Sequence, residues 1–580
     1  MTKANVKFEV KTIKATAETT AQAYLELLSL RGVDYFFANA GTDFASIVDA
    51  FACSQARGKE TPIPMLIPHE IPLVSIAHGY YLATGKPQVA MVHVGVGTAN
   101  GLGGIMNAYR SRVPIIFSAG CTPVAEKGGS VFRVPFLHWG QESFDQAGMV
   151  REYVKWDYEL RDAFQLETVV DRAFTIALTE PKGPVYLVLP PEVMISPVEE
   201  MEFSAQPRYD LPTFHPDPSK LQEAAGVLAR AKFPLVITSS IGRASSAVQA
   251  LMNLAEIGAV GVVSFNSEYM NFPYDHYCYQ GLSPDPYLRE VDVILVVDCD
   301  VPWYPGIVKP KESAVIIQVG IDPLYSNYPL RGFPSDITLQ GDPARVLSGI
   351  SGFLARHPDK DEGLIEARKT KLLVTHNAML ESWDAEWRDV ADDKPLDFRW
   401  ISHNVAKILD DNTFVVNEYD NGMHQQVYRH PGSYFGSPRA GYLGWGIGAA
   451  LGIKLALKDG VVIVTVGDGS YMFSVPSACH FVSNMYQLPI LIIVYNNQCW
   501  NAVKWSTRAL HPDGWAARNN RFPLCDFNGT ADYEKICEAF GGYGERVTDP
   551  DQVEPSIKRA LYVVKHEKRQ ALLNIICKNP

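Results

Sequence analysis

The sequence lacks the features that mark exported, zinc-binding or nucleic-acid-binding proteins. None of its nine cysteines forms a C-x-x-C pair, and they are scattered along 580 residues, so neither a disulfide framework nor a zinc site is indicated. The net charge of −12 is spread without long runs of one sign, which argues against a nucleic-acid partner. We therefore expect buried thiols in a cytoplasmic protein.

The sequence also has no apolar run that suits a membrane span. Residues 1–20 are polar and lack the apolar core of a signal peptide. The longest apolar stretch, residues 441–457, contains four interior glycines and Lys454 and is short for a bilayer. We expect no membrane partner, and we expect this stretch to form a buried helix packed closely on a sheet.

Strand-like apolar runs alternate with helical patterns in three blocks of similar size. This alternation is typical of βαβ units, and 580 residues are too many for one core. A proline-rich segment, 190–218, separates the first two blocks, and a charged helical stretch, 354–390, leads out of the second. We therefore predict an α/β fold of three doubly wound parallel-sheet domains.

The densest motif lies in the third block. A predicted buried strand, 461–466, runs into Gly467-Asp468-Gly469-Ser470, and a second, 488–495, ends on Asn496-Asn497. Their ends should meet at one edge of a parallel sheet, where such sheets bind ligands. Asp and Asn oxygens there suit Mg²⁺ or Ca²⁺, and the glycines and the next helix N-terminus suit a diphosphate. The alternative is an ordinary turn after a strand.

The first block contains two further candidates. Glu70 precedes a helix-like run, and its position alone indicates a helix-start carboxylate. His93 ends a strand and is followed by a glycine-rich turn, 95–104. This turn does not fit G-x-G-x-x-G, because Asn100 occupies the third glycine position and no acidic residue ends a following strand at the expected distance. A nicotinamide-cofactor site is therefore not expected.

Together these motifs resemble those of the thiamine-diphosphate (ThDP) enzymes of the acetolactate synthase, benzoylformate decarboxylase and 2-hydroxyacyl-CoA lyase group. Gly-Asp-Gly followed about 25 residues later by Asn-Asn is the ThDP motif of that family, and here residues 470–495 separate the two parts. The resemblance covers nearly the whole chain. It implies a pyrimidine-binding domain (1–190), a linker (191–218), a central domain (219–360), a helical linker (361–396) and a diphosphate-binding domain with a lid-like C-terminal segment (397–580).

The resemblance implies four catalytic residues. Glu70 matches the Glu that binds N1′ of the aminopyrimidine, so that the 4′-imino form can take the C2 proton of the thiazolium. Thr42 matches a substrate-contacting Ser, although Ala40 replaces the family's Pro. His93 matches an active-site His that handles protons near the substrate carbonyl, a structural strand-end histidine being the alternative. Gln141 matches a Gln that approaches the cofactor.

The resemblance also implies a set of cofactor and metal ligands. Leu443 would hold the cofactor bent by wedging between its rings, while the Gly441 carbonyl accepts from the 4′-amino group. Asp468, the Asn497 side chain and the main-chain oxygen of Cys499 would bind Mg²⁺. The other cofactor-binding residues that it implies are Gly422, His424, Gly469 and Ser470.

The resemblance has two limits. The central block has neither G-M-H-G nor R-F-D-D-R, so FAD is not expected, which argues against true acetolactate synthase activity. After Asn497 the chain carries Lys504 and several arginines between 506 and 521. This segment could bind a carboxylate or the phosphates of coenzyme A, could form a mobile lid, or could be a solvated loop.

The resemblance implies ThDP- and Mg²⁺-dependent cleavage or formation of a C–C bond beside a carbonyl. The expected substrate is a small molecule, a 2-oxo acid, which the enzyme decarboxylates with or without carboligation. The first alternative is a 2-hydroxyacyl-CoA lyase that releases an aldehyde or ketone and formyl-CoA, and the second is a non-catalytic homologue. A homodimer or homotetramer is expected, because in this family two subunits complete each site.

Overall fold

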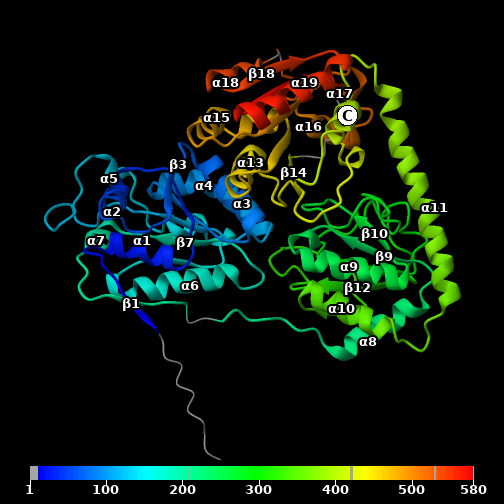
Figure 1. Cartoon of the computed structure of the whole chain (residues 1–580), viewed down its shortest axis with the longest axis horizontal. Coiled ribbons are helices and arrows are strands. Elements are labelled where there is room, and N and C mark those ends of the chain that lie inside the picture. The colour runs from blue at the N-terminus through cyan, green and yellow to red at the C-terminus, as the bar shows by residue number, and fades with distance from the viewer. Residues whose placement is uncertain (1–10, 208–209, 419–421, 528, 530, 579–580) are drawn as a thin grey trace, which may run out of the picture. The chain divides into compact units, whose positions relative to one another are not determined.

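The computed structural model describes residues 11–207, 210–418, 422–527, 529 and 531–578. The chain folds into two compact units (Figure 1). Unit 1 contains the residues up to 212 together with the segment 438–456, and unit 2 contains 213–437 and 457–580.

A six-stranded sheet, parallel throughout, forms the centre of unit 1. Three of its inner strands, at residues 89–92, 116–119 and 185–188, are short and largely apolar with every residue buried, as in parallel sheets covered on both faces. The strand order is β3 (Ile63–Leu66), β2 (Tyr35–Ala38), β4 (Val89–Val92), β5 (Ile116–Ala119), β7 (Val185–Val188) and β6 (Asp157–Glu159). The helices of this unit are α1 (Thr20–Leu30), α2 (Ala45–Ala56), α3 (Glu70–Thr84), α4 (Val94–Arg110), α5 (Leu137–Gly140), α6 (Leu166–Leu178), α7 (Pro191–Ile195) and α13 (Trp445–Ala456).

The buried helix predicted at 441–457 is present as α13, and it packs closely on helix α3. The reason is the absence of side chains at the contact. A Cβ atom added at Gly79, Gly448 or Gly452 would lie within 3.0 Å of atoms of the opposite helix. The two backbones therefore approach too closely for any larger residue at these positions.

Unit 2 contains two further parallel sheets. The first has the order β10 (Gly261–Ser264), β9 (Pro234–Thr238), β11 (Val293–Val297), β12 (Val315–Gly320) and β13 (Ile337–Gln340). The helices α8 (Pro218–Arg230), α9 (Ser245–Gly258) and α10 (Pro343–Leu354) pack with it. The helical stretch predicted at 354–390 is largely the long helix α11 (Glu362–Glu386), which runs along the side of unit 2 (Figure 1).

The other sheet of unit 2 has the order β15 (Tyr434–Gly436), β14 (Thr413–Glu418), β16 (Val461–Gly467), β17 (Leu491–Asn496), β19 (Ala571–Ile576) and β18 (Tyr543–Val547). Numbered along the chain, this order is 2-1-3-4-6-5, which is also the order of the unit 1 sheet. Its helices are α12 (Phe398–Ala406), α14 (Asp468–Phe473), α15 (Pro476–Met485), α16 (Asn501–Leu510), α17 (Trp515–Arg518), α18 (Tyr533–Ala539) and α19 (Pro550–Tyr562).

The predicted fold class, three doubly wound parallel-sheet α/β blocks, is confirmed. The segment predicted as a linker, 191–218, is partly structured, because it contains α7 and β8 (Glu202–Ser204), which pairs antiparallel with β1 (Thr12–Lys14). The exact domain boundaries stay a prediction. Among the helices in the described part of the chain, none is long and apolar enough to cross a membrane.

Candidate active site

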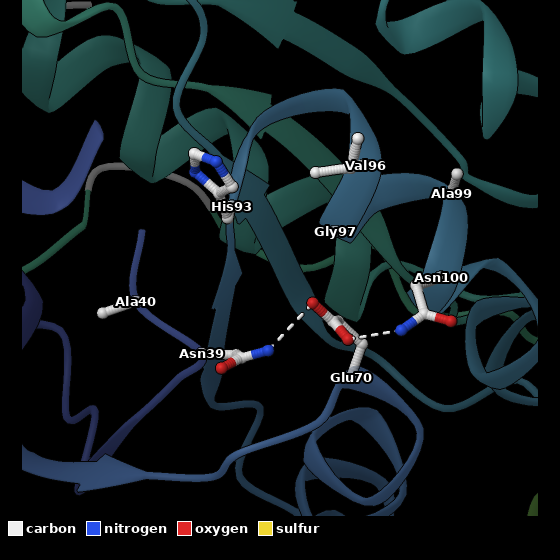
Figure 2. A pocket seen from close by; sticks show the side chains of 8 residues that line it. All are labelled: Asn39, Ala40, Glu70, His93, Val96, Gly97, Ala99 and Asn100. Atoms are coloured by element: carbon white, nitrogen blue, oxygen red, sulfur yellow. Dashed lines mark hydrogen bonds between the residues drawn. The ribbon is translucent and has the colours of Figure 1, made fainter. Parts of the chain in front are cut away.

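A carboxylate held by two amides forms the floor of a pocket in unit 1. Glu70 is the first residue of α3 and is only 7% exposed. Asn39 Nδ2 donates to its Oε1 at 2.9 Å, and Asn100 Nδ2 donates to its Oε2 at 2.5 Å, so the amides reach it from opposite sides (Figure 2). The pocket has a volume of about 640 Å³ and is lined by Asn39, Ala40, Glu70, His93, Val96, Gly97, Ala99 and Asn100.

The glycine-rich segment beside this pocket is helical, whereas the sequence predicts a turn at 95–104. Glycine weakens a helix in isolation, so composition alone favours a turn. Packing overrides this preference in α4, because a Cβ atom at Gly97 would lie 2.9 Å from Val92 Cβ and 3.2 Å from Glu70 Oε1. One at Gly104 would lie within 3.0 Å of Val74. The glycines let this helix lie close to α3 and β4.

His93 lies at the carboxyl end of β4 and caps α4. Its Nδ1 is 2.6 Å from Asp43 Oδ1, and its Nε2 is 3.2 Å from Gln141 Nε2. The hydrogen bond and charge of Asp43, together with the charge of Glu70, raise the pKa of His93 above its usual value against the lowering effect of burial. The predicted residues Glu70, His93 and Gln141 thus lie in one connected region of unit 1.

The loop after β2 fits around His93 because it contains Gly41. A Cβ atom at this position would lie within 3.0 Å of the imidazole ring. Thr42, the next residue, begins a 3₁₀ turn (Thr42–Phe44) and is exposed. This loop and His93 follow β2 and β4, which are neighbours at the point where the strand order reverses, the usual ligand site of such sheets.

The segment predicted to hold the cofactor rings is clamped to α4 in unit 1. Asn107 Nδ2 donates to the carbonyl of Tyr442 at 2.9 Å, and the Tyr442 N–H donates to Asn107 Oδ1 at 3.2 Å. On either side of this clamp, Gly441 has a left-handed φ of +68°, and Leu443 is half-buried. The clamp fixes the backbone that presents both residues.

In unit 2, the Gly-Asp-Gly turn and the Asn pair meet at one edge of a sheet, as the sequence predicts. Asp468 follows β16 and Asn497 follows β17, and these strands pair in parallel with Gly467 opposite Tyr495. Asp468 Oδ2 accepts from the Gln498 N–H at 2.7 Å, which ties the two strand ends together. Asn497 Oδ1 accepts from the Cys499 N–H at 3.1 Å.

The donor atoms at this edge fit a hard cation. Asp468 is 2% exposed, and burial raises the pKa of its carboxyl to about 6, so the charge would gain from a neighbouring cation. The Cys499 carbonyl accepts from the Asn501 N–H at 3.0 Å, and a carbonyl oxygen can accept two such contacts. No cluster of three or more His, Cys, Asp or Glu side chains in the described residues could hold a metal. A magnesium ion would therefore need amide, main-chain and diphosphate oxygens.

The remaining predicted cofactor residues also lie in unit 2. Gly469 and the buried Ser470 are in the first turn of α14, and Trp500 packs against Gly469 where a side chain would otherwise be. Gly422 has a φ of +76°. His424 Nε2 is 2.9 Å from Glu386 Oε2, so it pairs with the end of α11. Asn421, part of the predicted Gly422 turn, lies outside the described residues.

The basic segment after Asn497 is mostly helical. It forms α16 and α17, and Lys504 pairs with Asp526. Arg508 donates to Asn520 Oδ1 at 2.9 Å and lies over the ring of Phe522. The two other arginines predicted as anion ligands, Arg518 and Arg521, are exposed.

Sequence reasoning misses Asp43, Asn107 and the role of Asn39 and Asn100 as partners of Glu70. Helical periodicity could have identified two of these residues, Asn100 and Asn107. On a helix beginning after His93, the spacing of Val96, Asn100 and Asn107 puts all three on one face. The glycines favour a turn over a helix, so the sequence gives no reason to look for helical periodicity there. Asp43 has no such signal, since its partner His93 is distant in sequence.

Comparison with known proteins gives the family. Residues 18–149 match the family described as thiamine pyrophosphate enzyme, N-terminal TPP binding domain, and residues 420–575 match its C-terminal TPP binding domain. A benzoylformate decarboxylase of Pseudomonas aeruginosa is 26% identical over 557 residues, which cover 94% of this chain and 97% of that protein. A probable acetolactate synthase large subunit of Methanocaldococcus jannaschii is 23% identical over 573 residues, 93% of this chain and 89% of that protein.

The fold is also that of a solved relative. The thiamine-diphosphate-dependent 4-hydroxybenzoylformate decarboxylase of Rhodococcus jostii has a TM-score of 0.78 at 22% identity, covering 97% of this chain and 99% of that one. Thiamine pyrophosphate and thiamine diphosphate are the same molecule. The chain belongs to the thiamine-diphosphate-dependent enzymes that act on C–C bonds, the family that includes the acetolactate synthases and benzoylformate decarboxylases.

Proposed function

We propose that the enzyme cleaves or forms a C–C bond beside the carbonyl of a 2-oxo acid, by decarboxylation with or without carboligation, using ThDP and Mg²⁺. The observation that carries this proposal is the pocket of unit 1. It combines a buried carboxylate, Glu70, held by two amides, with a histidine, His93, in the lining of the same pocket. The two groups serve the two proton transfers that such a reaction requires.

Bound ThDP supplies a nucleophilic carbon and an electron sink. Glu70 binds the aminopyrimidine at N1′ and shares a proton with it, while Asn39 and Asn100 keep the carboxylate in place. The Gly441 carbonyl would accept from the 4′-amino group, and the Leu443 side chain would contact the cofactor rings. The clamp between Asn107 and Tyr442 supports these two roles, because it fixes the backbone between them.

Unit 2 supplies the diphosphate and metal ligands in this proposal. Mg²⁺ is held by the side chains of Asp468 and Asn497 and the main-chain oxygen of Cys499. Gly469 and Ser470, in the first turn of α14, bind the diphosphate, as helix N-termini commonly do. Because the Gly469 N–H donates to Asp468 Oδ1 at 2.8 Å, Ser470 is the donor of this pair. Gly422 and His424, which belong to another turn, also bind the diphosphate. His424 must then contact it through Nδ1 or give up the contact between its Nε2 and Glu386.

Three residues of unit 1 act on the substrate. His93 gives a proton to the carbonyl oxygen and takes it back on product release. Gln141, 3.2 Å from His93 Nε2, orients the ring and borders the substrate. Thr42, exposed in the loop next to His93, donates a hydrogen bond from its hydroxyl to the substrate.

We further propose a cytoplasmic homodimer or homotetramer, in which a second subunit completes each site. Exposed apolar side chains in one segment of unit 1 support a subunit contact there: Phe136, Trp139 and Phe144. Sedimentation of the purified protein tests this, and a monomer that retains full activity would contradict it.

A 2-hydroxyacyl-CoA lyase is the second candidate. The exposure of two basic residues of unit 2, Arg518 and Arg521, favours this candidate. Their guanidinium groups suit hydrogen bonds to the phosphates of coenzyme A. The products would be an aldehyde or ketone and formyl-CoA.

One experiment separates the two candidates. Purified enzyme with ThDP and Mg²⁺ is incubated in parallel with a panel of 2-oxo acids and a panel of 2-hydroxyacyl-CoA thioesters, and the products are followed by mass spectrometry. We expect CO₂ from one class of 2-oxo acid and no reaction of the thioesters. Formyl-CoA with a carbonyl product, and no CO₂, would contradict the 2-oxo acid proposal.

A further inference from the structure

Asp43 is a second buried carboxylate close to the pocket of unit 1. Its side chain is 2% exposed, and its two oxygens contact three hydrogen-bonding groups. Oδ1 contacts His93 Nδ1 at 2.6 Å, while Oδ2 accepts from the Val94 N–H at 3.2 Å and the Gly120 N–H at 3.0 Å. Val94 takes a left-handed φ of 34° at this point, a strained conformation for a β-branched residue.

This arrangement fixes the tautomer of His93. An ionised carboxylate can only accept hydrogen bonds, so the proton between Asp43 and His93 must belong to His93 Nδ1. Nε2 of the neutral ring then carries no proton and is a hydrogen-bond acceptor. Gln141 Nε2 donates to it at 3.2 Å. The ring can neither rotate nor exchange its two nitrogens without losing the Asp43 bond, and Gly41 leaves it no room to move toward the loop.

We propose that Asp43 is a positioning residue that makes His93 Nε2 the proton-carrying atom of the site; this rests on the proposed function. When the substrate carbonyl is attacked, its C=O π bond opens and the oxygen takes the proton from Nε2. The same proton returns to Nε2 when the carbonyl of the product forms. The hydrogen bond and negative charge of Asp43 stabilise the protonated ring.

The charges around His93 set the direction of its pH dependence. Asp43, from the loop after β2, and Glu70, from α3, both favour the protonated ring, and burial opposes them. Gln141, from the end of α5, is neutral. Removal of the Asp43 charge should therefore lower the pH at which His93 titrates.

The first test measures His93 itself, without any substrate. Diethyl pyrocarbonate acylates the neutral imidazole, and the extent at His93 is followed by peptide mass spectrometry against pH. In the wild type we expect the midpoint above 6.5, the ordinary histidine value, and in Asp43→Asn a lower midpoint. Asp49→Asn, an exposed carboxylate of α2, is the matched control and should leave the midpoint unchanged. A wild-type midpoint below 6.5, or no shift in Asp43→Asn, would overturn the proposal.

The second test uses turnover on the substrate found in the panel. Asp43→Asn should lower kcat about 10- to 100-fold and shift the pH profile in the same direction as the acylation midpoint. In a His93→Gln background, Asp43→Asn should cause no further loss, because Asp43 acts through His93. An additional loss of the same size would show an independent structural role. If no 2-oxo acid reacts, the proposed function fails, while the acylation midpoints still decide the role of Asp43.

Discussion

A few hydrogen bonds and two glycines position the polar side chains of the pocket in unit 1. Glu70 needs a donor on each oxygen, and the amides of Asn39 and Asn100 provide them. Gly41 and Gly97 provide space, because side chains there would enter the His93 ring and the Glu70 carboxylate region respectively. The two amides and the two glycines therefore allow Glu70 and His93 to line one pocket.

Gly41→Ala tests this at the His93 ring. The added methyl would overlap the imidazole, so the ring must move away from Asp43. We expect turnover to fall about 10²-fold, the low end of general acid–base contributions, with ThDP affinity nearly unchanged. Gly140→Ala, where a Cβ atom would meet nothing within 4 Å, is the control. Equal activity of the two variants would contradict this account of His93.

Asp468→Ala tests the metal site. The buried carboxylate is the only charged ligand among the proposed set, so its removal should abolish Mg²⁺ and ThDP binding together in calorimetric titrations. Asp459→Ala, an exposed turn residue before β16, should bind both normally. Tight ThDP binding by Asp468→Ala would remove Asp468 from the ligand set.

Sequence reasoning finds the site residues that carry a motif and misses those that act only through space. Asp468 and Asn497 are predictable because each ends a buried strand, and neighbouring parallel strands end at one edge. Asp43 is not, because its importance depends on β2 and β4 being adjacent, which no local pattern specifies. The roles of all these residues stay predictions until they are tested.

At the scale of elements, glycines place helices where larger residues could not go. Helices α3 and α13 touch through Gly79, Gly448 and Gly452. The apolar composition of α13 predicts a buried helix, but composition does not specify α3 as its packing partner. The glycine spacing at 448 and 452, one helical turn, was the available signal for a helical partner.

Gly452→Ala tests this packing. Its methyl group would meet the backbone of Ile76 and Tyr80, which cannot move aside cheaply. We expect a loss of about 1–3 kcal/mol in the free energy of unfolding, seen as a lower calorimetric midpoint. Gly352→Ala in α10, whose nearest neighbour is the end of the Arg356 side chain at 3.9 Å, should instead be neutral or stabilising by about 0.5–1 kcal/mol. A stable Gly452→Ala protein would argue against the close packing.

Helix α14, which begins with Asp468, is anchored by a buried hydrogen-bond chain. The Tyr471 hydroxyl donates to His480 Nε2 at 2.8 Å, and His480 Nδ1 donates to Gln570 Oε1 at 2.7 Å. This chain links α14 to α15 and to the start of β19. No sequence motif indicates it, because Gln570 is 90 residues from His480 and all three residues are of ordinary type.

At the scale of the whole molecule, two sheets share the strand order 2-1-3-4-6-5. The sequence shows this repetition only as blocks of similar size, since strand order depends on long-range pairing. In unit 1 the pocket lies where the order reverses, beside β2 and β4. In unit 2 the Asp468 turn follows β16, the strand at the equivalent position. Both follow the general rule for ligand sites in doubly wound sheets.

The pH dependence of stability follows from two buried histidines. Burial lowers the pKa of His78, in α3, to about 3 and that of His480 to about 4. The unfolded chain therefore binds protons that the folded chain does not, and stability that is complete above pH 6.5 is lost as the pH falls toward 4. For His480 the loss is up to about 3 kcal/mol.

Calorimetric midpoints between pH 7 and pH 4 measure this effect. His480→Gln should show a shallower decline than the wild type, whatever its stability at pH 7. His511→Gln, at an exposed position, should decline as steeply as the wild type. Parallel curves for His480→Gln and the wild type would mean that His480 does not stay neutral in the folded protein.

The most direct test of the central claim, that Glu70 activates ThDP for C–C chemistry, needs no substrate. The exchange of the C2 proton of bound ThDP with deuterium is measured by rapid quench and NMR in the wild type, in Glu70→Gln and in the control Glu60→Gln, an exposed carboxylate. We expect Glu70→Gln to bind ThDP but to exchange about 10²- to 10⁴-fold more slowly than the other two. Exchange in ThDP-loaded Glu70→Gln as fast as in the wild type would contradict the account.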